Sequence, residues 1–285
     1  MASRSVHAGG RRAETVTGQV ESGTASLIRD PDRSDAWLLE VQGTRQSHVD
    51  LANPTDLGFD YVRRIGHVID ERWTSADPLD AVHLGGGGLT IPRFIAASRP
   101  GSRQRAFEVD TALTDFVRCH LPLEASWRIR VRGIDARQGL ESLKGESADL
   151  IINDVFARAR VPAHLASLDM LSSVVRVLRG DGVYVANIVD APPLTFSRTQ
   201  VANAMAAFAH VVLVVPGGVL KGRRHGNLVL VASAASLPVG RLAQLCTADP
   251  SPSRVLAGDA IDRFRAGAPT VTDRTAMDSP AVVDR

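Results

Sequence analysis

Four consecutive glycines, Gly85 to Gly88, are the residues of this sequence that most directly indicate chemistry. They directly follow a short apolar run, residues 81–84, and a helical pattern begins at residue 91. Glycine is needed where a backbone takes positive φ or lets a ligand come close, and the helix N-terminus beyond the turn presents free N–H groups. The segment therefore predicts a strand, a tight turn and a helix start on which an anionic or polar ligand would lie.

A carboxylate follows this turn at a sequence spacing that is typical of nucleoside-binding folds. Glu108 lies within a second apolar segment, residues 106–110, eighteen residues after Thr90. Nucleoside-binding folds use an acidic residue at about this spacing to bind ribose hydroxyls. The turn and Glu108 together favour a nucleoside site, and a purely structural glycine turn in an unrelated α/β protein is the alternative.

Three further acidic residues follow apolar segments: Asp110, Asp135 and Asp154. In open α/β sheets, ligands lie outside the carboxyl ends of the strands, which is where these residues would be. Asp110 and Asp135 can equally be helix N-caps. Asp154 closes a buried apolar strand with no cation beside it in sequence, which favours a base that removes a proton from an ammonium group.

The elements that must position these residues alternate between strand and helix patterns from residue 81 onward. This alternation is typical of a parallel sheet covered on both faces by helices. Strands are expected at 81–84, 103–109, 127–132, 150–153, 183–188, 210–215 and 227–232, and helices at 91–98, 111–120, 136–143, 166–177 and 199–207. The sequence thus predicts an α/β fold with a Rossmann-like, seven-stranded sheet whose last two strands form a hairpin around residues 221–224.

A small antiparallel β unit and an amphipathic linking helix are expected ahead of this sheet. Short alternating segments separated by turn signals lie between residues 25 and 49, and apolar residues recur at helical spacing over 59–72. Four parts follow: a flexible leader at 1–22, the β unit with its helix at 23–75, the Rossmann-like nucleoside-binding domain at 76–247, and a partly disordered C-terminal extension at 248–285.

Composition excludes several classes of function. The 285 residues carry a net charge of +2 with acids and bases interleaved, and the basic run at 221–225 lacks interleaved aromatic residues, so no nucleic acid partner is expected. No apolar run reaches the roughly 18 residues of a membrane span, and two cysteines make no disulfide framework. We therefore expect a cytoplasmic protein without a membrane partner, and the histidine spacing predicts no metal site.

The order of these motifs resembles the spermidine synthase family. The resemblance covers nearly the whole chain from about residue 25 and rests on Gln46, residues 61–67, the glycine turn, and residues 108–110, 135–137, 153–154 and 272–273. It implies a methyltransferase-type sheet with a small N-terminal β unit, a homodimer, and transfer of an aminopropyl group from decarboxylated S-adenosylmethionine to the amine putrescine.

The resemblance also assigns roles to residues. The donor would be held by Gln46, Gly85, Gly86, Gly87, Glu108, Asp110, Asp135 and Ala136. The general base would be Asp154, with Tyr61 as its helper.

Three positions depart from the family pattern. Gly88 stands where the family usually has an Asp that neutralises the donor's amine, Arg63 replaces an acidic contact of the amine site, and Ala157 replaces a second carboxylate beside the base. A cation and a missing carboxylate disfavour a dication unless Arg63 points away, so weak or absent transfer to putrescine is expected.

Three functions remain open at this stage. The first is a transferase that presents an adenosyl sulfonium donor to an amine or other nucleophile beside Asp154, mostly by orienting the reactants. The second is an S-adenosylmethionine-dependent methyltransferase, favoured by Gly88 because a missing Asp makes room for the carboxylate of the intact donor. The third is a non-catalytic, nucleoside-binding relic of the family.

Overall fold

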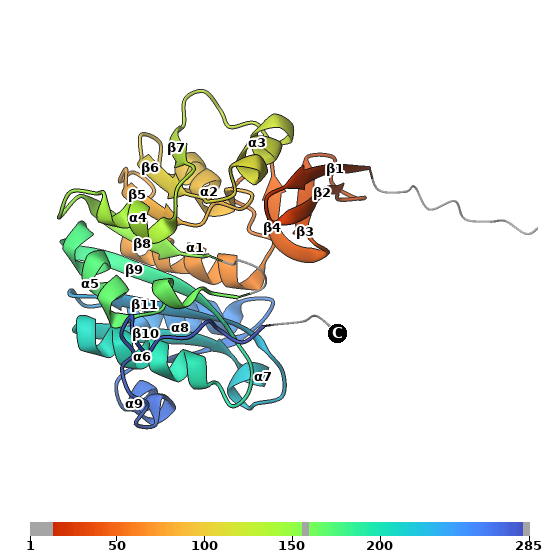
Figure 1. The fold of residues 1–285 in the computed structure, drawn as a ribbon. Coiled ribbons are helices and arrows are strands. Elements are labelled where there is room, and N and C mark those ends of the chain that lie inside the picture. Colours follow the sequence, from red (N-terminus) through yellow and green to blue (C-terminus); the bar gives the residue numbers. More distant parts are fainter. Residues whose placement is uncertain (1–13, 156–159, 282–285) are drawn as a thin grey trace, which may run out of the picture.

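Two β-sheets make up the fold in the computed structural model, which describes residues 14–155 and 160–281. A four-stranded antiparallel sheet stands beside an eight-stranded, mostly parallel sheet with helices on both faces (Figure 1). The α/β class, the Rossmann-like sheet and the small N-terminal β unit are thereby confirmed. No helix among the described residues has the length and apolar character needed to cross a membrane.

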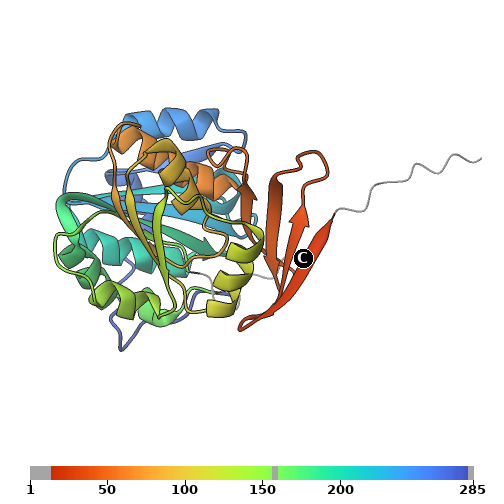
Figure 2. The same cartoon turned by 90° about the horizontal axis from the view of Figure 1, so that it is seen from above.

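The small sheet has the strand order β1-β2-β3-β4. Its strands are β1 (Thr15–Val20), β2 (Gly23–Arg29), β3 (Ala36–Val41) and β4 (Thr44–Asp50). Alternation along the strands turns Ala25, Leu27 and Leu39 inward, and they pack against Leu113 and Val117 of α3 (Thr111–His120). Figure 2 shows this sheet standing to one side of the large one, next to α3.

The expected leader at 1–22 is wrong in its second half. Residues 15–20 form β1, which pairs along its full length with β2, while residues 1–13 lie outside the described part of the chain. The hairpin is also tied to the large domain, because the backbone N–H groups of Glu21 and Ser22 donate to the carboxylate of Asp110 at 3.2 and 2.8 Å. Two valines in a Thr- and Gly-containing strand are too weak an apolar signal to show β1 in the sequence.

The large sheet has the strand order β12-β10-β11-β9-β8-β5-β6-β7. Its strands are β5 (Asp80–Leu84), β6 (Arg103–Phe107), β7 (Arg128–Arg132), β8 (Ala148–Asn153), β9 (Leu178–Asp190), β10 (His210–Pro216), β11 (Gly226–Ser233) and β12 (Ser253–Leu256). The pairs from β9 to β7 are parallel, and the β10–β11 hairpin is antiparallel, as expected.

An eighth strand extends this sheet beyond the seven predicted. The four-residue β12 pairs with β10 at the sheet edge, so the boundary expected at residue 247 does not separate a loose extension from the domain. The later tail is anchored as well: the N–H of Leu168 donates to the Val271 carbonyl at 2.8 Å, and that of Val161 to Ser279 Oγ at 2.8 Å. A four-residue strand is too short for a periodic signal, so the sequence did not reveal it.

Helices cover the two faces of the large sheet. One core lies between the sheet and α4 (Ala136–Glu141), α5 (Leu168–Val177), α6 (Thr195–Ala207) and α9 (Asp259–Arg265). A second core lies between the sheet and α1 (Asp60–Arg72), α2 (Thr90–Ser98) and α8 (Val239–Ala248). Two short helices, α7 (Gly217–Leu220) and the 3₁₀ helix η1 (Ala163–Leu165), lie in loops. Because α1 packs on the large sheet, it belongs to that domain rather than to the β unit with which it was grouped.

Candidate functional site

The glycine turn lies at the carboxyl end of β5, between two neighbouring strands. Gly85 and Gly87 adopt positive φ, +91° and +47°. A Cβ on Gly85 would lie 2.5 Å from the carbonyl oxygen of Asp154, and a Cβ on Gly87 would lie 2.9 Å from Ser47 Oγ. Side chains are therefore excluded at both positions by conformation and by space.

Glu108 follows β6 and lies directly against this turn. Its Oε2 accepts hydrogen bonds from the N–H groups of Gly86 and Gly87 at 2.8 and 3.4 Å, and its Oε1 accepts from the N–H of Asp110 at 3.0 Å. A carboxylate has about four lone-pair sites, so acceptor capacity remains for ligand hydroxyls. The half-buried Glu108 is thus brought to the turn as the sequence predicted.

Strand β4 contributes the other wall of the turn. Ser47 Oγ accepts from the N–H of Gly88 at 2.9 Å, and a Cβ on Gly88 would lie 2.8 Å from Ser47 Cβ. The space expected to open at Gly88 is therefore filled by β4, and the argument that this glycine makes room for a donor carboxylate is wrong.

Gln46 lies next to Ser47 at an irregularity of β4. The register passes from Leu39↔Ser47 to Glu40↔Arg45, which leaves Gln46 as the extra residue of a β-bulge. Bulges re-aim a side chain and are common beside functional sites. This bulge gives the half-buried Gln46 an orientation that a regular strand would not provide.

Asp154 follows β8 and collects polar partners from three other elements. Its N–H donates to the Leu84 carbonyl at 2.9 Å, which holds it beside the glycine turn. Its Oδ2 accepts from the Tyr61 hydroxyl on α1 at 3.2 Å, and its Oδ1 accepts from Asn187 Nδ2 on β9 at 2.8 Å. Asn227 on β11 donates in turn to Asn187 Oδ1 at 3.0 Å.

Burial raises the pKa of Asp154, while the hydrogen bonds from Asn187 and Tyr61 act in the opposite direction. Burial also raises the pKa of Tyr61 well above its usual value, and the charge and hydrogen bond of Asp154 add to the rise. Tyr61 therefore remains a protonated donor while Asp154 has an increased affinity for a proton. This is the electrostatic setting of a general base.

Sequence reasoning missed Asn187 and Asn227. Each lies on a strand among apolar neighbours, and nothing in its local sequence indicates which carboxylate it would reach. The signal available was a polar side chain inside an otherwise apolar strand, which requires a partner when it is buried.

Asp110 and Asp135 both serve as helix N-caps. Asp110 Oδ1 accepts from the N–H of Leu113 at 2.8 Å, and its carboxylate also holds the β1–β2 hairpin, so its acceptor capacity is directed away from the turn. Asp135 Oδ1 accepts from the N–H groups of Arg137 and Gln138 at the start of α4.

The second oxygen of Asp135 faces a side chain rather than backbone. His164 Nε2 lies 2.9 Å from Asp135 Oδ2. Burial acts to raise the pKa of Asp135, but the hydrogen bonds from His164 and the helix backbone lower it overall. The Asp135 side chain is about one-third exposed, whereas Ala136 beside it is buried.

Arg63 does not carry a free charge toward the amine side of the site. Its guanidinium bonds to Asp249 at 3.2 Å, to the Asp60 carboxylate, and to the carbonyls of Leu57 and Gly58. It follows Tyr61 by two residues, which is about 200° around the helix. The expectation that Arg63 repels a dicationic acceptor is therefore wrong. Ala157, the other position of that argument, lies outside the described residues.

Comparison with known proteins gives two similar sequences and a similar fold. No protein-family model matches the chain. A polyamine aminopropyltransferase of Vibrio vulnificus (strain CMCP6) is 27% identical over 157 residues, which is 54% of this chain and 50% of that protein, so the match spans about half of the relative. The crystal structure of a probable spermidine synthase from Corynebacterium glutamicum ATCC 13032 superposes with a TM-score of 0.84 at 29% identity, covering 95% of this chain and 98% of that one.

A more distant likeness concerns the fold alone. Human methyltransferase-like protein 13, in complex with SAH, superposes with a TM-score of 0.52 at 20% identity over 72% of this chain and 90% of its own. The large sheet is therefore of the methyltransferase type.

Proposed function

We propose that this chain acts as a member of the spermidine synthase family and transfers an aminopropyl group from decarboxylated S-adenosylmethionine to an amine acceptor. The observation that carries the proposal is the position of Asp154. A carboxylate with a raised pKa, held by Tyr61 and Asn187, lies in backbone contact with a glycine turn that Glu108 lines. A nucleoside-type turn and a candidate base are thus neighbours.

The donor is held through its adenosyl part in this proposal. Glu108 accepts from the ribose hydroxyls with the lone pairs that the turn leaves free. Asp135 Oδ2 accepts from the adenine amine once His164 moves aside, and Ala136 forms the apolar surface under the base. Gln46, re-aimed by the bulge, and the turn of Gly85, Gly86 and Gly87 complete the contacts.

The reaction is an in-line displacement for which the protein supplies orientation and a proton acceptor. The amine nitrogen forms a bond to the donor's propyl carbon while the carbon–sulfur bond breaks, and the sulfonium leaves as a neutral thioether. An ammonium group has no lone pair to attack with, so its proton passes to Asp154. Tyr61, protonated throughout, keeps the carboxylate directed by donating to Oδ2.

The acceptor is an amine for which Asp154 supplies the counter-charge. Since Arg63 is neutralised by Asp249 and Asp60, the remaining reason to expect weak use of putrescine is Ala157, where the family carries a second carboxylate. A site with one carboxylate can balance one positive charge. A monoamine, or a diamine whose second ammonium group lies in solvent, should therefore bind better than a diamine whose two ammonium groups are both enclosed. We also propose that the protein is a homodimer, as the family resemblance implies, and that it is cytoplasmic, as its composition favours.

Calorimetry on the full chain tests the donor, with decarboxylated S-adenosylmethionine and the intact compound as titrants. We expect the decarboxylated compound to bind more tightly and aminopropylated amine to accumulate when an amine is added. Tighter binding of the intact donor would indicate a methyltransferase, and binding of neither would indicate a relic; either result overturns the proposal.

A further inference from the structure

The exposed face of strands β6 and β7 carries five arginines in register. Strand β7 alternates Arg128, Ile129, Arg130, Val131 and Arg132, so its arginines share one face, and they are exposed. The paired positions on β6 add two more, because Arg103 pairs with Arg128 and Arg105 with Arg130. Like charges directly opposite one another on a sheet face are destabilising, and Asp80 relieves this repulsion only at Arg103, so the Arg105–Arg130 pair costs stability unless an anion relieves it.

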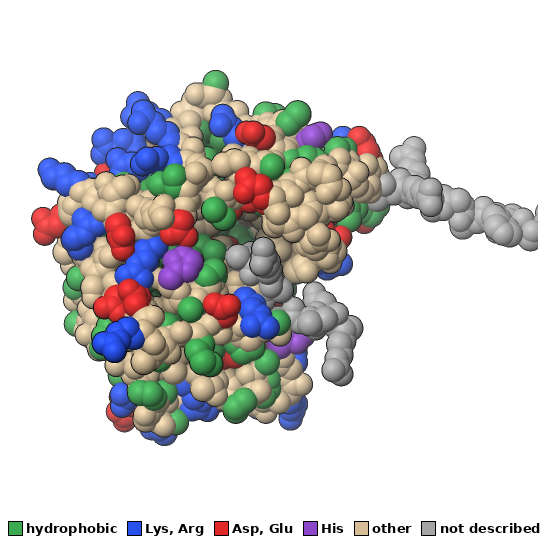
Figure 3. Space-filling view, in the orientation of Figure 1, with side chains coloured by type: hydrophobic (Ala, Val, Ile, Leu, Met, Phe, Trp, Pro, Cys, Tyr) green, Lys and Arg blue, Asp and Glu red, His purple; other side chains and the backbone are tan. Residues whose placement is uncertain are grey.

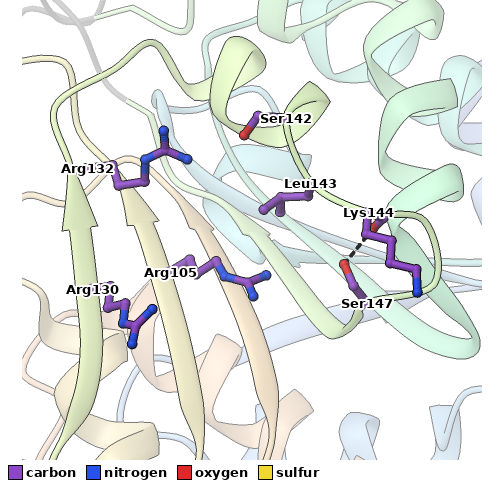
Figure 4. A pocket seen from close by; sticks show the side chains of 7 residues that line it. All are labelled: Arg105, Arg130, Arg132, Ser142, Leu143, Lys144 and Ser147. Carbon is purple, nitrogen blue, oxygen red and sulfur yellow. Dashed lines mark hydrogen bonds between the residues drawn. The ribbon is translucent and has the colours of Figure 1, made fainter.

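Part of this face closes into a hollow lined by positive side chains. A cavity of about 440 Å³ is bounded by the two strands and by the loop after α4, and its lining residues are Arg105, Arg130, Arg132, Ser142, Leu143, Lys144 and Ser147. Figure 4 shows the guanidinium groups of Arg105 and Arg132 extending from the strands toward the loop that carries Leu143 and Lys144. Figure 3 shows the same region as a gathering of basic side chains at the upper left, over β6 and β7 of Figure 1.

The four cations of this hollow have no carboxylate partner within the described residues. The neighbouring hollow, of about 570 Å³, provides the contrast. There Arg103 pairs with Asp80 at 2.7 Å, and Arg179 pairs with Asp80 and Asp149 at 2.8 and 2.5 Å. Arg105 and Lys144 line both hollows, so the unpaired positive charge lies in the first hollow and at its border with the second.

Protection of the sheet edge does not account for the arrangement. Charged side chains on an edge strand prevent pairing with another chain, and β7 is such a strand. Arg105, however, lies on β6, which is paired on both sides, and Lys144 lies in a loop. Edge protection therefore leaves Arg105 and Lys144 unexplained.

We propose that this hollow binds a compact oligophosphate, either a free inorganic one or the triphosphate of a nucleotide. A guanidinium group can donate two parallel hydrogen bonds to phosphate oxygens, and three arginines line the hollow. The ammonium group of Lys144 adds a fourth positive charge. The cavity has the size of a small-molecule site. Its lining contains no aromatic ring on which a base could stack, so the phosphates carry the recognition.

The hollow shares no lining residue with the candidate active site, and the two adjoin where the N–H of Glu108 donates to the Arg132 carbonyl at 3.1 Å. Asp135 lies at the N-terminal end of α4, and Ser142 to Ser147 follow its C-terminal end, with the helix between them. The inference therefore goes beyond the proposed function and does not depend on it.

Calorimetry with sodium tripolyphosphate on the full chain, at about 50 and 150 mM salt, tests the site. We expect binding that weakens by about tenfold or more in the Arg105→Gln/Arg130→Gln variant and in Arg132→Gln. The matched control is Arg128→Gln, which removes an exposed arginine from the same face outside the cavity and should change affinity less than about twofold. The double variant should melt at the same or a higher temperature without ligand, because a cross-strand repulsion is removed.

Titration with other phosphate compounds distinguishes a free oligophosphate from a nucleotide as the ligand, and it also gives the results that would contradict the proposal. Equal affinity for ATP and tripolyphosphate would indicate a free oligophosphate, and tighter binding of ATP would indicate a nucleotide; inorganic monophosphate should bind more weakly than either. No binding of tripolyphosphate at millimolar concentration would overturn the proposal. So would an equal loss in Arg128→Gln, or tighter binding of a DNA duplex that all the variants weaken alike, since these results describe an extended cationic surface.

Discussion

Ser47 on β4 accepts a hydrogen bond of 2.9 Å from the backbone N–H of Gly88, the last glycine of the turn. Both residues are buried, and this bond joins the small sheet to the carboxyl end of β5. Through it, the small unit fixes the wall of the site on which Gln46 lies.

Replacing Ser47 with Ala should weaken this joint. The buried Gly88 N–H would lose its acceptor, which costs about 1–3 kcal/mol of unfolding free energy. Urea unfolding measures the loss, and Ser126→Ala, at an exposed serine, is the control that should be neutral. Equal stability of the two variants would show that water or a neighbouring group replaces Ser47.

Replacing Glu108 with Gln should weaken donor binding by about 1–3 kcal/mol, which is roughly 5- to 150-fold in Kd. A neutral acceptor replaces a charged one, and the new amide group faces N–H donors at Gly86 or Asp110. Calorimetry with decarboxylated S-adenosylmethionine gives the change, with Glu124→Gln as an exposed control. Unchanged affinity with an intact fold would remove Glu108 from the site.

Arg63→Glu should destabilise the protein rather than improve an amine site. It would bring a third carboxylate beside Asp60 and Asp249, whose side chain is only 1% exposed, and breaking a buried ion pair costs about 3–5 kcal/mol. The decrease in unfolding free energy, measured with urea, should be larger for Arg63→Glu than for Arg63→Gln. This difference should become smaller at low pH, where the carboxylates become protonated. Arg45→Glu, at a side chain 68% exposed, is the control. A variant as stable as the parent would contradict the ion pairs seen here.

Two truncations should separate the leader from β1. Deletion of residues 1–13 should leave the melting temperature unchanged, because this segment has no apolar pattern to bury. Deletion of residues 1–22 removes β1 and the hydrogen bonds that Asp110 accepts from Glu21 and Ser22, so the melting temperature should fall. Equal melting temperatures for both proteins would show that β1 adds nothing to the fold.

Part of the candidate site could be predicted from the sequence because the residues that form it follow local patterns. The glycine turn and Glu108 follow adjacent parallel strands, and the caps at Asp110 and Asp135 act within three residues of themselves. Strand and helix periods are also local, so the alternating α/β pattern could be predicted from them.

The parts that could not be predicted depend on contacts between distant segments. Arg63 is turned away by Asp249, 186 residues later, and Gly88 is closed off by Ser47 of the other sheet. Asn187 reaches Asp154 across 33 residues, from a strand whose own pattern is only apolar. Such partners are fixed by packing of the whole chain, which a local pattern does not contain.

The pH dependence of activity should follow Asp154. A base must be unprotonated, so the rate of aminopropyl transfer should fall as the pH drops through the raised pKa of this carboxyl. Asp154→Asn should abolish transfer, because an amide takes no proton from the attacking ammonium. The hydrogen bonds can nevertheless survive, since Asn Oδ1 accepts from Asn187 and its Nδ2 can donate to the Tyr61 hydroxyl oxygen.

The stability of Asp154→Asn separates a catalytic role from a structural one. Because the pKa of Asp154 is raised on folding, the folded state holds this proton more tightly than the unfolded state does, and ionisation costs stability as the pH rises from the unfolded pKa through the folded one. The Asn variant lacks that cost, so at neutral pH it should melt at the same or a higher temperature than the parent. Below the ordinary carboxyl pKa of about 3.9 the advantage should vanish. Loss of transfer together with a clear fall in melting temperature at neutral pH would instead indicate a structural role for Asp154. A variant that has lost transfer but melts no lower than the parent would identify Asp154 as the base.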